Sequence, residues 1–205
     1  MAMNTTLRFP ALAALLAVAS FAACSDAPRE APEAAPATSA PAAAPTQTAA
    51  PATDLDAALA LGVPNAHEPS PGLLTSGQIT QAQMDALIQA GYGTFVSLRT
   101  PTEEGAGWEE AYAARKGIMF ARIPIGGPEG LTRANAEVLD QILKAAGDGK
   151  TALYCGSANR VGALLAMRAH WLEGATPEEA MAVGRAAGMT RLEADVARLL
   201  AAGTP

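Results

Sequence analysis

The stretch TALYCGSANRVGALLAM, residues 151–167, joins an apolar run, a short loop of small residues and the start of a helical pattern. The apolar run ends at Cys155, and residues 156–159 separate it from Arg160. A strand, a tight loop and a helix in succession form the repeating unit of α/β proteins. Because ligands of parallel sheets bind where strands end and helices begin, the stretch predicts a candidate site as well as a fold class.

Apolar runs alternate with helical patterns over the rest of the chain from residue 72 onward. Strands are predicted at 72–76, 94–98, 118–125 and 151–155. Helices are predicted at 80–91, 103–117, 132–147, 160–174, 176–188 and 189–203, with Thr80, Thr132 and Thr176 as N-caps. This alternation predicts an α/β single domain with a small, mostly parallel sheet of about four or five strands flanked by helices.

The loop after Cys155 has the composition of an anion-binding loop. Its four residues have small or polar side chains: Gly156, Ser157, Ala158 and Asn159. Backbone N–H groups of such a loop and of the first helical turn can converge on one anion, and the positive end of the helix favours a thiolate. The planar fork of Arg160 can hold two oxygens of a tetrahedral anion. We therefore expect an anion-facing thiol rather than the alternative, a buried structural cysteine.

Five segments share order and spacing with a known family: GLLTSGQIT (72–80), TFVSLRTPTEE (94–104), FARIPIGG (120–127), LTRANAEVLDQIL (131–143) and LYCGSANRVGALLAM (153–167). Together they resemble the phosphatase-like domain of beta-lactamase-hydrolase-like proteins, which is related to dual-specificity tyrosine phosphatases. The resemblance covers roughly residues 70–200. It implies a cysteine-phosphatase or rhodanese-like active-site loop, with Cys155 as the nucleophile and Arg160 as the phosphate-binding arginine. The implied activity is hydrolysis of phosphate esters through a Cys155 thiophosphate intermediate, without a cofactor.

The sequence departs from the related phosphatases at the loop and at the general acid. Classical tyrosine phosphatases have Cys-x5-Arg, whereas the Cys-x4-Arg spacing here is also the length found in rhodanese-type sulfurtransferases. Ala158 stands at the usual glycine of the family. Gly126 and Gly127 follow the strand where an aspartic acid is usual, and Glu129 is the nearest carboxylate. Two alternatives therefore stay open: a sulfurtransferase with a Cys155 persulfide and a sulfane substrate, or a catalytically weak domain that binds anions or phosphopeptides.

The N-terminal third predicts export rather than a folded domain. Residues 1–23 have one basic residue before a short apolar segment, as in an export signal, and the following Cys24 resembles the lipidation site of bacterial lipoproteins. Residues 24–54 are rich in alanine and proline and are predicted to be a disordered linker, which leaves 55–205 as the phosphatase-like domain. We expect a periplasmic protein, by resemblance an outer-membrane lipoprotein, that meets the membrane only through its lipid.

The charge and the remaining polar residues exclude several other functions. The formal net charge is −6 and the sequence has no basic run, which disfavours nucleic-acid binding. His67 and His170 have no metal-ligand partner at a useful spacing, so no metal site is predicted. We expect His67 to be exposed and His170 to be a packing or surface residue. Arg99 is expected to pair with Glu103 or Glu104 and hold a loop, and Trp108 to pack on Tyr112.

Overall fold

A computed structural model of the chain describes residues 53–203. The predicted signal segment, the lipidation residue Cys24 and all but the last two residues of the predicted linker lie outside the described residues. No helix within residues 53–203 is both long enough and apolar enough to cross a membrane.

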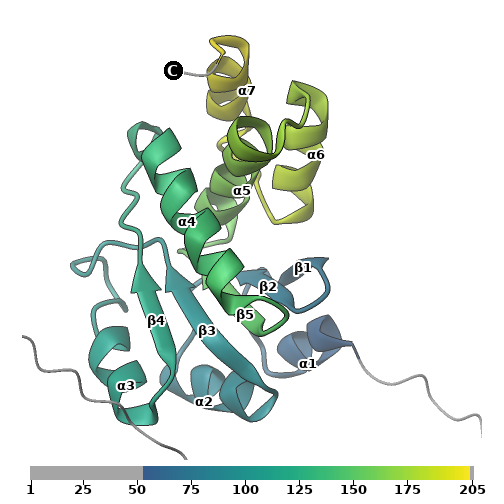
Figure 1. The fold of residues 1–205 in the computed structure, drawn as a ribbon. Helices are drawn as coiled ribbons and strands as arrows, with labels where there is room; N and C mark the ends of the chain where they lie inside the picture. The colour runs from purple at the N-terminus through teal and green to yellow at the C-terminus, as the bar shows by residue number, and fades with distance from the viewer. Residues whose placement is uncertain (1–52, 204–205) are drawn as a thin grey trace, which may run out of the picture. The chain divides into compact units, whose positions relative to one another are not determined.

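One five-stranded sheet forms the centre of the described fold (Figure 1). Its strands are β1 (His67–Ser70), β2 (Leu73–Ser76), β3 (Tyr92–Ser97), β4 (Met119–Arg122) and β5 (Lys150–Tyr154). Their order across the sheet is β1-β2-β5-β3-β4; only the β1–β2 pair is antiparallel, and the other three pairs are parallel. The predicted α/β fold with a mostly parallel sheet is confirmed.

Seven α-helices and one short 3-10 helix accompany the sheet in the described residues. They are α1 (Asp54–Ala60), α2 (Gln81–Gln89), α3 (Glu109–Lys116), η1 (Pro128–Gly130), α4 (Arg133–Ala146), α5 (Asn159–Glu173), α6 (Pro177–Ala186) and α7 (Glu193–Ala201). Thr80, Thr132 and Thr176 cap helices through their side chains, as the sequence predicts. Helix α3 ends at its C-cap Gly117, whose φ of 68° lies in the left-handed region that favours glycine.

Two apolar clusters lie on opposite faces of the sheet because successive strand residues point to opposite sides. In β3, Phe95 belongs to the cluster that includes residues of α1 and α2, whereas Val96 belongs to the cluster formed with α4, α5, α6 and α7. In β5, Ala152 and Leu153 divide in the same way. The strand that leads to Cys155 is thus buried on both sides, which fixes the position of its C-terminal end.

Several expectations from the sequence differ from the structure. The helix predicted at 103–117 begins only at Glu109, and α1 forms where no element was predicted. The polar segment around His67 forms the edge strand β1, and His67 is half-buried rather than exposed. Strand β4 ends at Arg122 instead of residue 125, and α7 begins at Glu193 instead of residue 189. In each case the segment makes contacts with distant residues, which local sequence patterns do not encode. The expected packing of Trp108 on Tyr112 is present, with ring centroids 5.4 Å apart.

Candidate functional site

Cys155 follows the central strand β5 at the C-terminal edge of the parallel strands. Its N–H donates to the carbonyl of Ser76 in β2 at 3.1 Å, and the preceding carbonyl of Tyr154 accepts from Leu98 after β3 at 2.8 Å. The residue is only 1% exposed and belongs to the apolar cluster around α5. The sulfur therefore lies at the bottom of the loop that connects β5 to α5, and not on the outer surface.

The loop after Cys155 ends in an uncapped helix N-terminus. Ala158 occupies the N-cap position of α5 with φ 63°, and no side chain caps the helix. The first N–H groups of any α-helix lack intrahelical acceptors, and they lie at its positive end. This left-handed φ is one that glycine adopts freely and alanine only with strain. The geometry suits an anion above Gly156, which is exposed.

Arg160 is oriented by an acidic partner from a distant loop. Its Nη1 and Nη2 donate to the two carboxylate oxygens of Glu103 at 2.9 and 2.8 Å, and Nη1 also donates to the carbonyl of Ile125 at 2.6 Å. Nε has no acceptor among residues 53–203. One edge of the guanidinium is thus held by Glu103, while the edge containing Nε is left for two oxygens of a bound anion.

The electrostatics of Arg160 and Glu103 follow from this pair. Hydrogen bonding from Arg160, with further contributions from Arg99 and the N–H of Thr100, lowers the pKa of Glu103 to about 2. The pKa of Arg160 is raised, first of all by its hydrogen bonds to Glu103, while burial acts in the opposite direction. Cys155 and Arg160 thus flank the same four-residue loop, the arrangement that a nucleophile and its anion-binding partner would need.

The Arg99 side chain holds the same acidic loop in place. Its Nε donates to Glu103 at 2.9 Å and its Nη1 donates to Gln78 at 3.0 Å. The expectation that Arg99 pairs with a nearby acid is confirmed. The link from Glu103 to Arg160 is not evident from the sequence, because 57 positions separate the two residues. A conserved pairing across relatives is the kind of signal that could reveal it.

Glu129, the candidate general acid, lies in η1 on the neighbouring loop. This loop begins at Ile125, whose carbonyl binds Arg160. The Glu129 side chain is exposed, folds back toward Gly127 and makes no hydrogen bond to Cys155 or Arg160 within the described residues. It lines two cavities of about 300 and 500 Å³ between η1 and α7, with Leu199 on the α7 side. The Glu129 carboxylate therefore makes no contact with the thiol, and neither cavity is lined by residues 155–160.

The remaining loop residues contact the turn between α6 and α7. Asn159 is buried, and its Oδ1 accepts from the N–H groups of Thr190 and Leu192 at 2.8 and 3.2 Å. Ser157 is half-buried, and its Oγ accepts from Arg191 at 3.4 Å. Asn159 thus connects two segments instead of capping its own helix, and only its Nδ2 remains as a donor for an anion.

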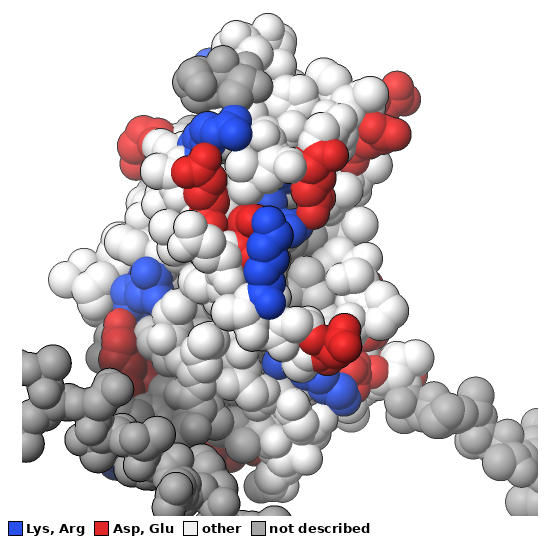
Figure 2. Space-filling model, in the orientation of Figure 1, with Lys and Arg blue, Asp and Glu red and all other residues white. Residues whose placement is uncertain are grey.

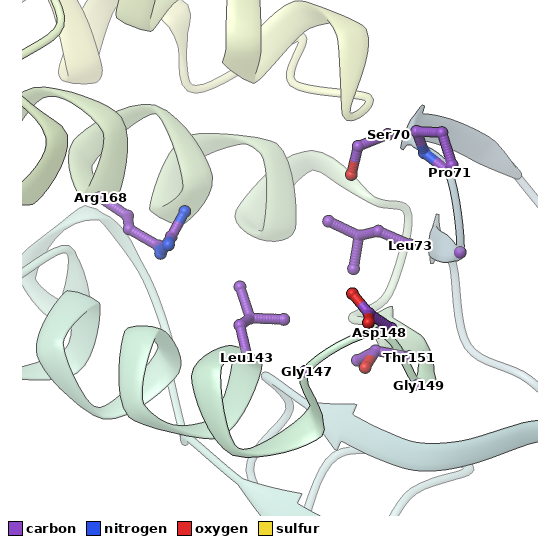
Figure 3. Close-up of a pocket in the computed structure, with 10 residues that line it drawn as sticks. Ser70, Pro71, Leu73, Leu143, Gly147, Asp148, Gly149, Thr151 and Arg168 are labelled. Atoms are coloured by element: carbon purple, nitrogen blue, oxygen red, sulfur yellow. The ribbon is translucent and has the colours of Figure 1, made fainter.

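A further cavity lies at the opposite end of the sheet, away from the Cys155 loop (Figure 3). It has a volume of about 450 Å³ and lies beside the N-terminal residues of β2 and β5, Leu73 and Thr151. Arg168, which lines it, is already paired with Asp140 and Glu173. On the face drawn in Figure 2, acidic and basic side chains are intermixed.

Neither a protein-family model nor a curated protein matches the sequence. Solved structures do match. A proposed phosphatase (DUF442) from Shewanella putrefaciens is 14% identical with a TM-score of 0.53, covering 69% of this chain and 94% of that one. A proposed phosphatase from Neisseria meningitidis is 20% identical with a TM-score of 0.52, covering 63% and 94%. Tk-PTP in its active form is 17% identical with a TM-score of 0.52, covering 68% and 98%. The described chain therefore has the phosphatase-like α/β fold that these structures share.

Proposed function

We propose that the protein is a cysteine-dependent phosphatase that hydrolyses phosphate esters at the Cys155 loop. The observation that carries the proposal is the orientation of Arg160, whose Nη groups are held by Glu103 while Nε has no acceptor in the described residues. A tetrahedral phosphate bound to that free edge and to the N-terminus of α5 would sit over Cys155. The fold shared with phosphatase structures supports the same reading.

The reaction proceeds in two displacements at phosphorus. The Cys155 thiolate attacks phosphorus, the bond to the ester oxygen breaks, and a thiophosphate forms on the sulfur. Glu129, as the proposed general acid, gives a proton to the departing alkoxide or phenoxide. Water then attacks the phosphorus and gives a proton to the Glu129 carboxylate, the P–S bond breaks, and inorganic phosphate and the thiolate are released. Arg160 and the loop N–H groups stabilise the charge on the phosphoryl oxygens in both steps.

The experiment that tests the proposal compares the protein with its Cys155→Ser variant on an aryl phosphate and, in parallel, on thiosulfate with cyanide. Phosphate release by the wild type that is lost in the variant is the expected result. Thiocyanate formation that depends on Cys155 would instead identify a sulfurtransferase. If neither product forms and phosphate still raises the melting temperature, the domain is an anion binder and the phosphatase proposal fails.

The role of Glu129 has its own test, because general acid catalysis matters most for poor leaving groups. The Glu129→Gln variant is expected to hydrolyse an alkyl phosphate about 10²-fold more slowly or worse, with a much smaller effect on an aryl phosphate. Glu137 on α4 is exposed and provides the matched control Glu137→Gln. If Glu129→Gln slows hydrolysis of both substrates equally, Glu129 is not the general acid.

We also propose that the protein is exported and anchored to the outer membrane through a lipid on Cys24, as the signal-like residues 1–23 suggest. The Cys24→Ala variant tests this proposal. We expect the wild-type protein in the membrane fraction and the variant outside it, and equal distribution of the two would contradict a lipid anchor.

A further inference from the structure

The turn between α6 and α7 is fixed onto the Cys155 loop by several contacts. The buried Asn159 accepts hydrogen bonds from Thr190 and Leu192, which flank Arg191 on either side. Just before them, the carbonyl of Ala187 accepts from the Thr75 hydroxyl in β2 at 3.1 Å. The backbone at Arg191 is therefore held relative to the loop, so its side chain starts from a defined position.

Arg191 is exposed, and its charge is not offset by an acidic partner in the described residues. Of the lysines and arginines between residues 53 and 203, all but Arg115 and Arg191 form an ion pair. Arg115 packs over the Tyr112 ring on α3, with 5.3 Å between its guanidinium carbon and the ring centroid. Arg191 instead reaches back to the Ser157 hydroxyl of the loop at 3.4 Å.

The two arginines at the loop thus differ in the charge they offer. Glu103 offsets the charge of Arg160 and fixes its guanidinium in one orientation, which suits the binding of a single phosphate. Arg191 lies at the rim beside Ser157 and offers an unshared positive charge. A phosphate in the loop would satisfy Arg160, and Arg191 would remain to attract a further negative group.

We propose that Arg191 binds a second anionic group of the substrate, so that the preferred substrates carry a phosphate or carboxylate close to the phosphate that is cleaved. The inference rests on the proposed phosphatase function. Because Asn159 and Ser157 hold the turn and the side chain in advance, less conformational entropy is lost when the second group binds. Arg191 thereby determines specificity, while Cys155 and Arg160 act on the scissile phosphate.

Binding to the Cys155→Ser protein tests the inference without catalysis. Calorimetric titrations with inorganic phosphate and with pyrophosphate are compared before and after adding Arg191→Gln. We expect Arg191→Gln to lower the affinity for pyrophosphate about fivefold and to lower the affinity for phosphate less. Arg191→Lys should restore part of the loss, because it keeps the charge without the fork. Arg115→Gln, which removes the other unpaired arginine, is the matched control and should leave both affinities unchanged.

The outcomes separate the inference from the function on which it rests. If phosphate binds and Arg191→Gln lowers both affinities equally or not at all, the second anion site is wrong and the phosphate site stands. If neither anion binds to the Cys155→Ser protein, the phosphate site itself is wrong, and the inference falls with it.

Kinetics with the active protein distinguish two sources of the second anion. One pair of substrates is a phosphotyrosine peptide with glutamate neighbours and the same peptide with glutamine neighbours. The other pair is a small bisphosphate and its monophosphate. In whichever pair the wild type prefers the more negatively charged substrate, we expect Arg191→Gln to reduce that preference about fivefold. The preference is the ratio of the two kcat/KM values, and the change should come mainly through KM. A ratio that is unchanged by the substitution in both pairs would overturn the proposal.

Discussion

Glu103 fixes Arg160 through both carboxylate oxygens, and the adjacent Glu104 is exposed and makes no ion pair in the described residues. Replacing Glu103 by glutamine is expected to lower kcat/KM for an aryl phosphate about tenfold, because the guanidinium loses its fixed orientation. Glu104→Gln is the control and should have little effect. Equal activities of the two variants would show that Arg160 is oriented without Glu103.

The same carboxyl group makes stability depend on pH in the acidic range. The pKa of Glu103 is about 2 in the folded protein, below its ordinary value of 4.5. A depressed pKa in the folded state contributes stability above about pH 4.5 that is lost as the pH falls toward 2. The difference in unfolding free energy between wild type and Glu103→Gln should therefore shrink between pH 5 and pH 2. Denaturant unfolding at several pH values measures it, and a constant difference would contradict the ion pair.

At Ala158, backbone strain and close packing act in opposite directions. Its φ is 63°, and a Cβ added at Gly188, itself at φ 92°, would lie 2.6 Å from the Ala158 methyl carbon. We expect Ala158→Gly to change the unfolding free energy by less than about 1 kcal/mol, because relief of strain offsets the loss of a buried methyl group. Gly188→Ala should cost about 2 kcal/mol or more. Its cost should be smaller in the Ala158→Gly background, and strict additivity would rule out the contact.

Helices α5 and α6 lie in close contact at two glycines, Gly162 and Gly184. A Cβ at Gly162 would lie 2.4 Å from the carbonyl oxygen of Gly184 and 2.5 Å from the backbone nitrogen of Met189. Since backbone atoms cannot rotate away, Gly162→Ala is expected to destabilise the fold by about 3 kcal/mol or more and to displace the start of α5. Gly93→Ala is the control, because a Cβ there meets nothing within 4 Å. A Gly162→Ala protein as stable as this control would show that the helices can separate freely.

Most elements could be predicted from local sequence because their signals are local. The Thr132 hydroxyl caps α4 by accepting from the N–H of Asn135, only three residues away, and Gly117 ends α3 through its own φ. Strand β1 has no such signal, since HEPS contains proline and polar residues and becomes a strand only by pairing with β2. The start of α7 has no local signal either, because the N–H groups of Thr190 and Leu192 donate to the distant Asn159.

The candidate site divides in the same way. The loop that joins Cys155 to Arg160 could be placed because strand, loop and helix are consecutive in the sequence. The residues that contact the loop could not be identified, because they come from three other parts of the chain: Glu103 and Ile125 bind Arg160, and Arg191 binds Ser157. Sequence spacing specifies a loop, whereas the orientation of its arginine depends on which distant residues the fold brings beside it.

For the whole molecule, anion binding should be linked to stability. A ligand that binds only the folded state at about 100 times its Kd adds about 2.7 kcal/mol, or roughly 5–10 °C in Tm for a domain of this size. We expect phosphate to raise the Tm of the wild type by this order at saturation. Arg160→Lys keeps the charge but lacks the fork, and its Tm should respond much less. An equal rise in both proteins would indicate a general salt effect and not a site.

The position of α1 has a consequence for how the protein can be attached to a surface. Asp54 binds Lys150 at 2.6 Å, so the described chain enters the fold at the N-terminal end of β5, whereas Cys155 lies at the other end of that strand. A bead or sensor chip coupled to the chain directly before Asp54 would therefore leave the loop facing outward, toward dissolved substrate. Coupling through the C-terminus, where Gly203 shares a cavity with Glu129, would instead place the support beside the loop that carries the proposed acid.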